Sequence, residues 1–567
     1  MGIAIKKLEP SDIAAFEEFL KTERRELPEL MLAPLASPHE DIAVIACKQE
    51  KYDLELFAEE HQFVLTAHHG NIISLSKREP VRSTDHSRCI FSGYAFYNNK
   101  MLIGMDEVVS NTNDIRDLYE ACGEFSICLI GGGCIKCSSD FFGMVPWFYF
   151  EDECVFAASN NYHLMLTLLA EMHIELSMNI PRSRVNMITS GFMYGTVFSK
   201  ELDVNGCKIN LAYEEVNFSP IHGTYLTQTS LRDVLTSREK WDDDRYEHYI
   251  IKAKSEIESN CRAALEHNSF NKVIIDISGG FDSRIVFAAA CGLPRKLRSK
   301  IHTFTRKSGT QDDVEKASAV TNLYQYPKYS YYNMDTSKLF DTSGRVNLAQ
   351  VSRTLGLFSV NSHLYMSRYS DHKTLEITGY LGEVILGFMR CRGELDYSLG
   401  DKRLLARLGG CYLHNSVHEL KDIFHDQEII INKMLSNYSG CDCLFKKFQQ
   451  LYIDSRNRFI CGSSHNIEHD NLRIPMLFSK YALKAKWMYF NRFNNNEVPD
   501  EKISVDLLTA INPLLAALPF ASNNDNVIPQ QSNLLNPVHV EIKPDNTIYP
   551  PPPKRQLPIN IYTDKVI

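Results

Sequence analysis

Residues 272–292 read KVIIDISGGFDSRIVFAAACG, and this stretch decides the fold of the C-terminal half of the chain. The run KVIIDI predicts a short buried strand, and SRIVFAAACG predicts a helix that ends at Gly292. Between them, Gly279 and Gly280 let the backbone turn sharply and come close to a ligand. The free N–H groups of such a turn and of the helix that follows bind anions. The stretch therefore predicts a phosphate-binding loop between a strand and a helix.

The side chains of this loop indicate a nucleotide held together with a metal ion. Ser278 and Ser283 carry hydroxyl groups that donate hydrogen bonds to phosphate oxygens. Asp282 repels a bare phosphate, but Mg²⁺ takes carboxylate and phosphate oxygens together, so we expect Mg²⁺ between them. The simpler alternative is a strand–helix turn that happens to contain two glycines. The complete SGGFDS sequence favours the nucleotide site, although it matches neither GxxxxGK[ST] nor GxGxxG.

Strands and helices alternate on both sides of the loop. Helical periodicity covers YEHYIIKAKSEIESNCRAALEH before it and DDVEKASAVTNLY after it, and IHTFT, at 301–305, predicts a second short strand. This alternation is typical of a doubly wound parallel sheet, so we expect an α/β fold there. Most of residues 400–520 has a helical pattern. Asp276, inside the first predicted strand, needs a partner if it is ionised.

Short strands separated by turns fill the chain from about residue 62 to about residue 220. Their segments, rich in β-branched and aromatic residues, include HQFVLTAHHGNIISL, RCIFSGYAFYNNKMLIG and EFSICLIGGGCIKCSSD. We expect hairpin turns at GGG, 131–133, and EDE, 151–153. The expected division is an extension over 1–60, an antiparallel α+β domain over 61–225, the α/β domain over 235–525, and an Asn- and Pro-rich, extended or disordered tail over 526–567.

The composition is that of an ordinary globular protein. Of 567 residues, 44% are hydrophobic and 23% are charged. The net charge of −9 argues against a large nucleic-acid footprint, which is normally basic. No apolar run reaches the roughly 18 residues of a membrane span, and the N-terminus is too polar for a signal peptide. We therefore expect a cytoplasmic protein that engages neither nucleic acid nor membrane.

The 15 cysteines are scattered along the chain and are typical of free thiols in a cytosolic protein. Cys134 and Cys137 have CxxC spacing. A zinc site needs a second pair of cysteine or histidine ligands at a matching distance, and the sequence has none there. We expect these two cysteines to be strand residues.

With these motifs in place, the chain resembles a known family. SGGFDS matches the SGGxDS signature of the PP-loop ATP pyrophosphatases, and residues 62–520 resemble the branch formed by asparagine synthetase and β-lactam synthetase. The resemblance implies a PP-loop synthetase domain behind an Ntn-hydrolase-like, glutaminase-type domain. It also implies that ATP is cleaved between its α- and β-phosphates. The expected nucleotide-binding residues are then the loop Ser278–Ser283, which includes Phe281, together with Arg284 and Thr303.

Three downstream segments carry the resemblance further. TFTRKSGTQDDVEKASAV resembles the branch's second nucleotide stretch, with Asp312 and Asp313 as its acidic pair. GYLGEVILG, 379–387, resembles the Gly-rich segment around a metal ligand, which makes Glu383, here in place of the usual Asp, the second carboxylate on Mg²⁺ after Asp282. NLRIPML, 471–477, resembles Glu-x-Arg-x-Pro-Phe-Leu with Asn471 in place of the Glu.

The upstream domain resembles a glutaminase that lacks its nucleophile. GYAFYNN, 93–99, and SSDFFGMVPWFY, 138–149, resemble two of its segments. Glutamine hydrolysis in the family needs a cysteine at the mature N-terminus, whose own amine activates the thiol. Here Met1 precedes Gly2, and the first cysteine is Cys47. One possibility is that the domain is retained only as a scaffold. The alternative is cleavage of the chain before Cys47 or Cys89, which would create an N-terminal cysteine.

The resemblance implies a reaction in which ATP and Mg²⁺ activate a carboxylate as an acyl-adenylate. An amine then forms the amide as AMP leaves. Tyr380 is the expected aid in taking the amine proton, and a phenol of reference pKa about 10 needs a basic neighbour for this. Lys502 is the expected catalytic lysine, and its alternative is a solvated lysine. Arg284 either touches phosphate or caps an acidic neighbour.

Other functions remain open at this point. The amine could be ammonia, a peptide or glycan amine, or an amine of the same substrate, as in lactam- or macrolactam-forming cyclases. A non-catalytic ATP-binding relative is a further alternative, and sulfur transfer to tRNA is disfavoured by the charge and the cysteine pattern. The expected partners are a small or peptidic carboxylate and an amine, and we include a homodimer among them.

Overall fold

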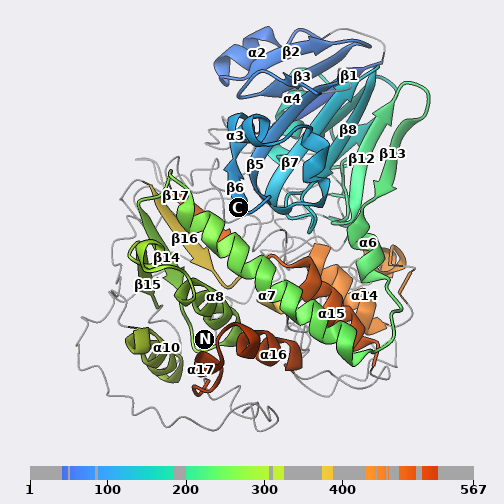
Figure 1. The fold of residues 1–567 in the computed structure, drawn as a ribbon. Helices are drawn as coiled ribbons and strands as arrows, with labels where there is room; N and C mark the ends of the chain where they lie inside the picture. The colour runs from blue at the N-terminus through green and yellow to red at the C-terminus, as the bar shows by residue number, and fades with distance from the viewer. Residues whose placement is uncertain are drawn as a thin grey trace, which may run out of the picture.

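The computed structural model places the following residues. They are 41–48, 52–83, 87–177, 179, 181–182, 199–202, 204–305, 311–324, 373–386, 429–430, 432–438, 440–441, 444–454, 458, 471–492 and 501–520. In this part of the chain two antiparallel sheets precede one parallel sheet, so the protein is α+β with sheets of both kinds (Figure 1). The predicted tail over 526–567 lies outside these residues, as do residues 1–40.

The first sheet is antiparallel and contains the first described strand in its interior. Its order is β11 (Lys208–Ile209), β9 (Phe148–Glu151), β10 (Val155–Ser159), β1 (Ala43–Cys47), β3 (Ile72–Ser76) and β2 (Val64–His68). β1 pairs with β10 on one side and with β3 on the other. The predicted boundary at residue 61 is therefore wrong, because the sheet begins at residue 43. The five residues AVIAC are all buried, so they lack the alternation that marks a half-exposed strand.

The second sheet is also antiparallel. Its order is β13 (Gly223–Gln228), β12 (Glu214–Ser219), β8 (Cys134–Ser139), β7 (Cys122–Gly131), β5 (Arg88–Tyr97) and β4 (Val81–Arg82), with β6 (Lys100–Ile103) also paired to β5. The hairpins predicted at 131–133 and 151–153 are confirmed, since they join β7 to β8 and β9 to β10. Cys134 and Cys137 lie in β8, as expected.

Helices cover the outer faces of these two sheets, which pack against each other. They are α2 (Glu55–Glu60), α3 (Gly104–Asn111), the 3-10 helix η2 (Ile115–Glu120) and α4 (Tyr162–Glu171). β1 alternates between two cores: Val44 faces the core between the sheets, and Ile45 faces the core beneath α2 and α4. A third core, with Val108, lies between the second sheet and α3. The result is four layers, helices–sheet–sheet–helices.

The third sheet is parallel throughout its four strands. Its order is β15 (Ile301–Phe304), β14 (Lys272–Asp276), β16 (Thr374–Thr378) and β17 (Asn471–Pro475). The strands predicted at 272–277 and 301–305 are confirmed as its β14 and β15. Within the region 400–520, where much of the sequence has a helical pattern, β17 is a strand that the pattern does not predict. Five residues that carry a buried charge and a proline give no strand signal of their own.

The helices of this part pack on the parallel sheet and on one another (Figure 1). They are α6 (Ser230–Leu235), α7 (Asp243–Glu266), α8 (Phe281–Cys291), α9 (Arg295–Arg298), α10 (Gln311–Tyr324), α11 (Gly382–Ile385), α14 (Leu444–Tyr452), α15 (Lys480–Phe490), α16 (Lys502–Ile511) and α17 (Pro513–Ala516). α8 contacts β14, β16, α7 and α16. No described helix combines the length and apolar character that crossing a bilayer requires.

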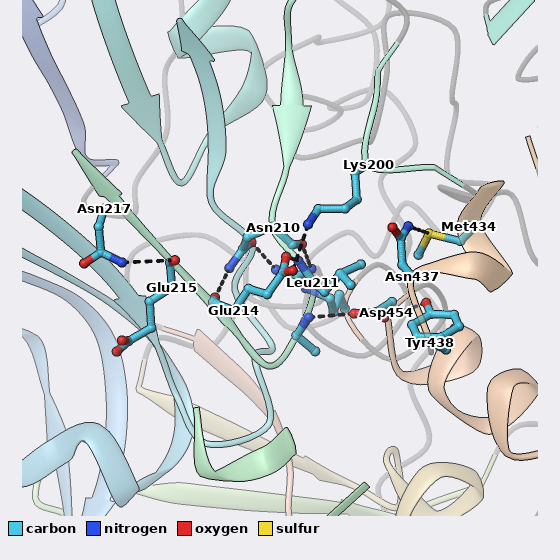
Figure 2. A network of polar contacts seen from close by, with 12 residues as sticks. Lys200, Asn210, Leu211, Glu214, Glu215, Asn217, Met434, Asn437, Tyr438 and Asp454 are labelled. Carbon is cyan, nitrogen blue, oxygen red and sulfur yellow. Dashed lines mark hydrogen bonds and ion pairs between the residues drawn. The ribbon is translucent and has the colours of Figure 1, made fainter. Parts of the chain in front are cut away.

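A polar network joins the antiparallel part to the C-terminal helices (Figure 2). The loop between β11 and β12 supplies Asn210 and Ala212, and the chain after α14 supplies Asp454 and Arg458. The amide of Ala212 donates to Oδ1 of Asp454 at 2.6 Å, and the hydroxyl of Tyr438 donates to Oδ2 at 2.6 Å. Nη1 of Arg458 donates to the carbonyl of Asn210 at 2.5 Å, and Nη2 donates to its Oδ1 at 2.8 Å.

Candidate nucleotide-binding site

The SGGFDS loop lies at the carboxyl end of an interior strand of the parallel sheet. β14 ends at Asp276, and the loop continues into α8, which begins at Phe281. From β14 the chain moves outward to β15 and then returns past β14 to β16. The strand order thus reverses between β14 and β16. Ligands of open α/β sheets bind outside the carboxyl ends of the strands at such a reversal.

Hydrogen bonds between its two serines hold the loop in shape. The amide of Ser278 donates to Oγ of Ser283 at 2.9 Å, and the two hydroxyl oxygens are 3.0 Å apart. The amide of Gly280, the residue before α8, donates to Oγ of Ser278 at 3.3 Å. The first N–H groups of any α-helix have no acceptor within that helix. The first N–H groups of α8 therefore lack helical acceptors, and they follow directly on the loop.

Two glycines of the segment after β16 pack directly on the loop. A Cβ atom at Gly379 would lie 2.5 Å from the amide nitrogen of Ser283. A Cβ atom at Gly382 would lie 1.9 Å from Cγ of Asp282. Neither position has room for a side chain unless the loop shifts. The fold therefore brings together SGGFDS and GYLG, which the sequence proposed as two parts of one site.

The backbone between these glycines is strained. Leu381 has a positive φ of 78°, a left-handed conformation that costs a branched side chain energy. Its side chain is buried, with 2% of its surface exposed. Backbone strain of this kind collects at functional sites, where the surrounding structure holds it in place.

The metal ligands predicted from the sequence are placed in part. Asp282 lies against Gly382, and the backbone of Glu383 follows directly in α11. The side chains of Glu383, Asp312, Asp313 and Asn471 lie outside the described residues, although their backbones belong to α11, α10 and β17. Among the side chains that are described, no group of three or more His, Cys, Asp or Glu could hold a metal. Mg²⁺ bound with a nucleotide needs only one or two protein carboxylates, and Asp282, against Gly382, supplies one carboxylate of the chemistry that this metal takes.

The guanidinium of Arg284 donates to backbone carbonyls of the chain after α17 and of the loop itself. Its side chain is fully buried, and its guanidinium donates to the carbonyls of Leu518 and Pro519, each at 2.9 Å. It also lies 3.7 Å from the centre of the Phe520 ring. Burial lowers its pKa to about 9. Arg284 thus joins the chain after α17 to α8, and its Nη2 also lies 3.5 Å from the Gly279 carbonyl of the loop. These carbonyls take the place of the acidic neighbour predicted as one alternative, and the expected phosphate contact stays a prediction.

Two further predicted nucleotide contacts have buried side chains. Phe281 is 6% exposed and stacks on Phe520 with ring centres 4.0 Å apart. Thr303 is 2% exposed and lies in β15 beside Ile275 of β14. Phe281 can therefore offer its backbone N–H to a nucleotide, whereas its ring belongs to the core.

Tyr380 lies beside the loop, and its hydroxyl has a cationic neighbour. Nη2 of Arg473 donates to the Tyr380 hydroxyl oxygen at 3.3 Å and to Oδ2 of Asp276 at 3.2 Å. The partner predicted for Asp276 is therefore confirmed. Nε of Arg473 is in ion-pair contact with Oε1 of Glu376 at 3.1 Å. The sequence signal for this group was a charged residue inside each of the segments KVIID, TLEIT and NLRIP.

The position of Lys502 does not support its predicted catalytic role. Its Nζ donates to Asp506 on the same helix at 2.6 Å and lies 5.3 Å from the centre of the Tyr246 ring. These contacts place it between α16 and α7. A different lysine, Lys486 of α15, is 3% exposed, and its Nζ donates to the carbonyl of Val384 in α11 at 2.6 Å. The sequence signal for this lysine was its place among the apolar residues of KYALKAKWMYF, and Lys486 was not among the predicted site residues.

The antiparallel part offers no terminal nucleophile in the described residues. Cys47 is the last residue of β1, and Cys89 lies in β5. Both are buried, and burial raises the pKa of the Cys47 thiol. A cut before either would divide a strand that is paired on both sides, and a cut before Cys47 would remove β1 from the sheet interior. This geometry disfavours activation by such a cut.

No protein-family model matches the chain, and a search of the curated proteins returned no significant match.

Proposed function

We propose that this protein is an asparagine synthetase-like ligase that uses ATP and Mg²⁺ to activate a carboxylate and join it to an amine. In this proposal the parallel sheet belongs to a PP-loop domain, and the four-layer part is a glutaminase-like domain without a nucleophile. The observation that carries the proposal is the packing of Gly379 and Gly382 on Asp282 and Ser283. Two segments that are distant in the sequence, one expected to bind the nucleotide and the other its metal ion, meet at the strand-order reversal.

The triphosphate of ATP lies on the loop in this proposal. The N–H groups at the start of α8 and the hydroxyls of Ser278 and Ser283 donate to phosphate oxygens. Asp282 and Glu383 hold Mg²⁺, which when bound offsets the negative charge of the phosphates. Asp282 needs this metal, because a carboxylate beside phosphate is otherwise repelled.

The reaction has two steps. A carboxylate oxygen of the substrate attacks the α-phosphorus, the bond to the bridging oxygen of the β-phosphate breaks, and pyrophosphate leaves. An amine nitrogen then attacks the acyl carbon, the bond between that carbon and the AMP oxygen breaks, and a proton leaves the nitrogen. Fixed N–H donors stabilise the charge that develops on the phosphate, an effect worth several kcal/mol in comparable sites. Tyr380 is the group beside the loop that can take part in moving the amine proton.

The amine comes from a source other than glutamine in this proposal. The strands that carry Cys47 and Cys89 are paired on both sides, so neither cysteine offers an N-terminal nucleophile. Ammonia or an amine within the substrate fits a domain retained as a scaffold, and the network of Asp454 and Arg458 gives that scaffold a structural role.

Pyrophosphate release tests the proposal. Wild type, Asp282→Asn and the control Asp506→Asn, in which the change lies on α16, are incubated with Mg²⁺, ATP and a panel of carboxylates with and without ammonium. We expect release that depends on one class of carboxylate, is retained in Asp506→Asn and is lost in Asp282→Asn. Binding of ATP without release, over amino acids, peptides and sugar acids, would favour a non-catalytic ATP-binding protein.

A further inference from the structure

A buried arginine lies in the parallel sheet close to where both loops begin. Arg473, in β17, is 1% exposed and stands opposite Glu376 of β16 in the strand register. Burying a cation costs a large free energy unless it is paired and hydrogen-bonded. The partners that compensate this cost therefore indicate what the residue holds in place.

These partners come from two other strands of the sheet. The Asp276 carboxylate and the Tyr380 hydroxyl oxygen both accept from Nη2, at 3.2 Å and 3.3 Å. The guanidinium carbon lies 4.9 Å from the centre of the Tyr380 ring, and Glu376 is in ion-pair contact with Nε. A planar guanidinium makes such contacts in one fixed arrangement, which the single ammonium of lysine cannot reproduce.

The partners lie at the bases of the two loops. Asp276 ends β14 and is followed, after Ile277, by the first serine of SGGFDS. Tyr380 follows Gly379, which packs against Ser283. One side chain therefore fastens the strand that leads into the loop to the segment that covers it.

We propose that Arg473 is a positioning residue that sets the distance between the SGGFDS loop and the GYLG segment, and so the affinity for Mg²⁺ and ATP. This inference rests on the proposed function. Arg473 acts through Asp276 and Tyr380 and does not itself touch the nucleotide. A small displacement of either loop moves the amides, hydroxyls and Asp282 carboxylate away from a rigid ligand, which weakens binding.

Titration calorimetry with Mg²⁺ and ATP tests the inference in the full-length protein. We expect Arg473→Lys to raise the Kd about tenfold and Tyr380→Phe, which removes only the hydroxyl, about threefold. The double variant should bind no more weakly than Arg473→Lys alone, because both changes break one network. The matched control is Arg458→Lys, another buried arginine in a polar network, which should lower thermal stability and leave the Kd unchanged.

The outcomes separate this inference from the proposed function. If Asp282→Asn binds Mg²⁺ and ATP as wild type does, the nucleotide site is wrong and the role of Arg473 falls with it. If Asp282→Asn weakens binding while Arg473→Lys and Tyr380→Phe keep the wild-type Kd, only the positioning role is overturned. Additive effects of the two changes would also overturn it. Should Arg473→Lys fail to fold, Tyr380→Phe and Asp276→Asn decide the question by the same measurement.

Discussion

The backbone amide of Ala212 donates to the carboxylate of Asp454 at 2.6 Å, across 242 residues of sequence (Figure 2). Asp454 is 4% exposed, and the hydroxyl of Tyr438 donates to its other oxygen. One carboxylate therefore holds the loop before β12 against the helices of the C-terminal part.

We expect Asp454→Ala to lower the free energy of unfolding by about 3 kcal/mol, because it leaves the amide of Ala212 and the hydroxyl of Tyr438 without their acceptor and removes the negative charge near the buried Arg458. Urea unfolding followed by circular dichroism measures this change. The control is Asp106→Ala, whose carboxylate is 81% exposed and pairs with Arg78 at the surface, and which should cost less than about 1 kcal/mol. Equal losses in the two variants would show that the buried contact adds nothing.

The same carboxylate makes stability depend on pH. Burial is the larger effect and raises the pKa of Asp454 to about 6, against the opposing effect of Arg458. The folded state therefore holds this proton to a higher pH than the unfolded state, and its contribution is complete below about pH 4 and lost as the pH rises through 6. Relative to Asp454→Asn, which does not titrate, wild type should lose up to about 1.4 kcal/mol for each pH unit in this window. Parallel stability curves from pH 4 to 7 for the two proteins would contradict this assignment.

Gly382 should be intolerant of any side chain. Its Cβ would lie 1.9 Å from Cγ of Asp282, so Gly382→Ala must displace the carboxylate, and we expect affinity for Mg²⁺ and ATP to fall at least about tenfold. Gly292→Ala, at the other end of α8, is the control, since its Cβ would meet nothing closer than 3.5 Å and binding should be unchanged. Wild-type affinity in Gly382→Ala would separate the GYLG segment from the nucleotide site.

Arg284 should matter for stability more than for binding. Arg284→Met removes the donors to the carbonyls of Leu518 and Pro519 in a buried setting, and we expect a loss of about 3 kcal/mol in the free energy of unfolding. Affinity for ATP in the folded variant should stay within about twofold of wild type, since the shorter hydrogen bonds of the guanidinium, at 2.9 Å, go to Leu518 and Pro519, and its bond to the Gly279 carbonyl of the loop is 3.5 Å long. Chemical denaturation and calorimetry on the same sample decide between this role and a phosphate contact.

Glutamine should not replace ammonium as the nitrogen source. The thiol of Cys47 is buried inside a paired strand and has a raised pKa, so it is a poor nucleophile. We expect no glutamate release from glutamine by wild type, and the same amide-forming rate in Cys47→Ser as in wild type with ammonium. Glutamate release by wild type that disappears in Cys47→Ser would show that the protein hydrolyses glutamine and that Cys47 is needed for it.

Local sequence was sufficient to predict those strands, turns and helices whose structure depends only on residues adjacent in the chain. The strand β14, the loop and α8 follow from a β-branched run, two glycines and an alanine-rich helix, all within 272–292. The hairpin turns at 131–133 and 151–153 also depend on adjacent residues alone. β1 was missed because its five residues are all buried and lack alternation, and β17 because its short segment NLRIP contains a charged residue and a proline. The strands that pair with them lie far away in the sequence.

Local sequence was enough to predict a glycine-containing turn between a buried strand and a helix, because glycine permits a sharp turn and a serine hydroxyl bonds to the backbone of the same loop. Only the tertiary structure decided what surrounds that loop. The strand order places β16 beside β14, which brings Gly382 onto Asp282 and lets Arg473 reach both Asp276 and Tyr380. It also turned Arg284 toward the chain after α17 and Lys502 toward α7. Long side chains contact residues that are far away in the sequence. The separation of two residues along the chain does not give their distance in space.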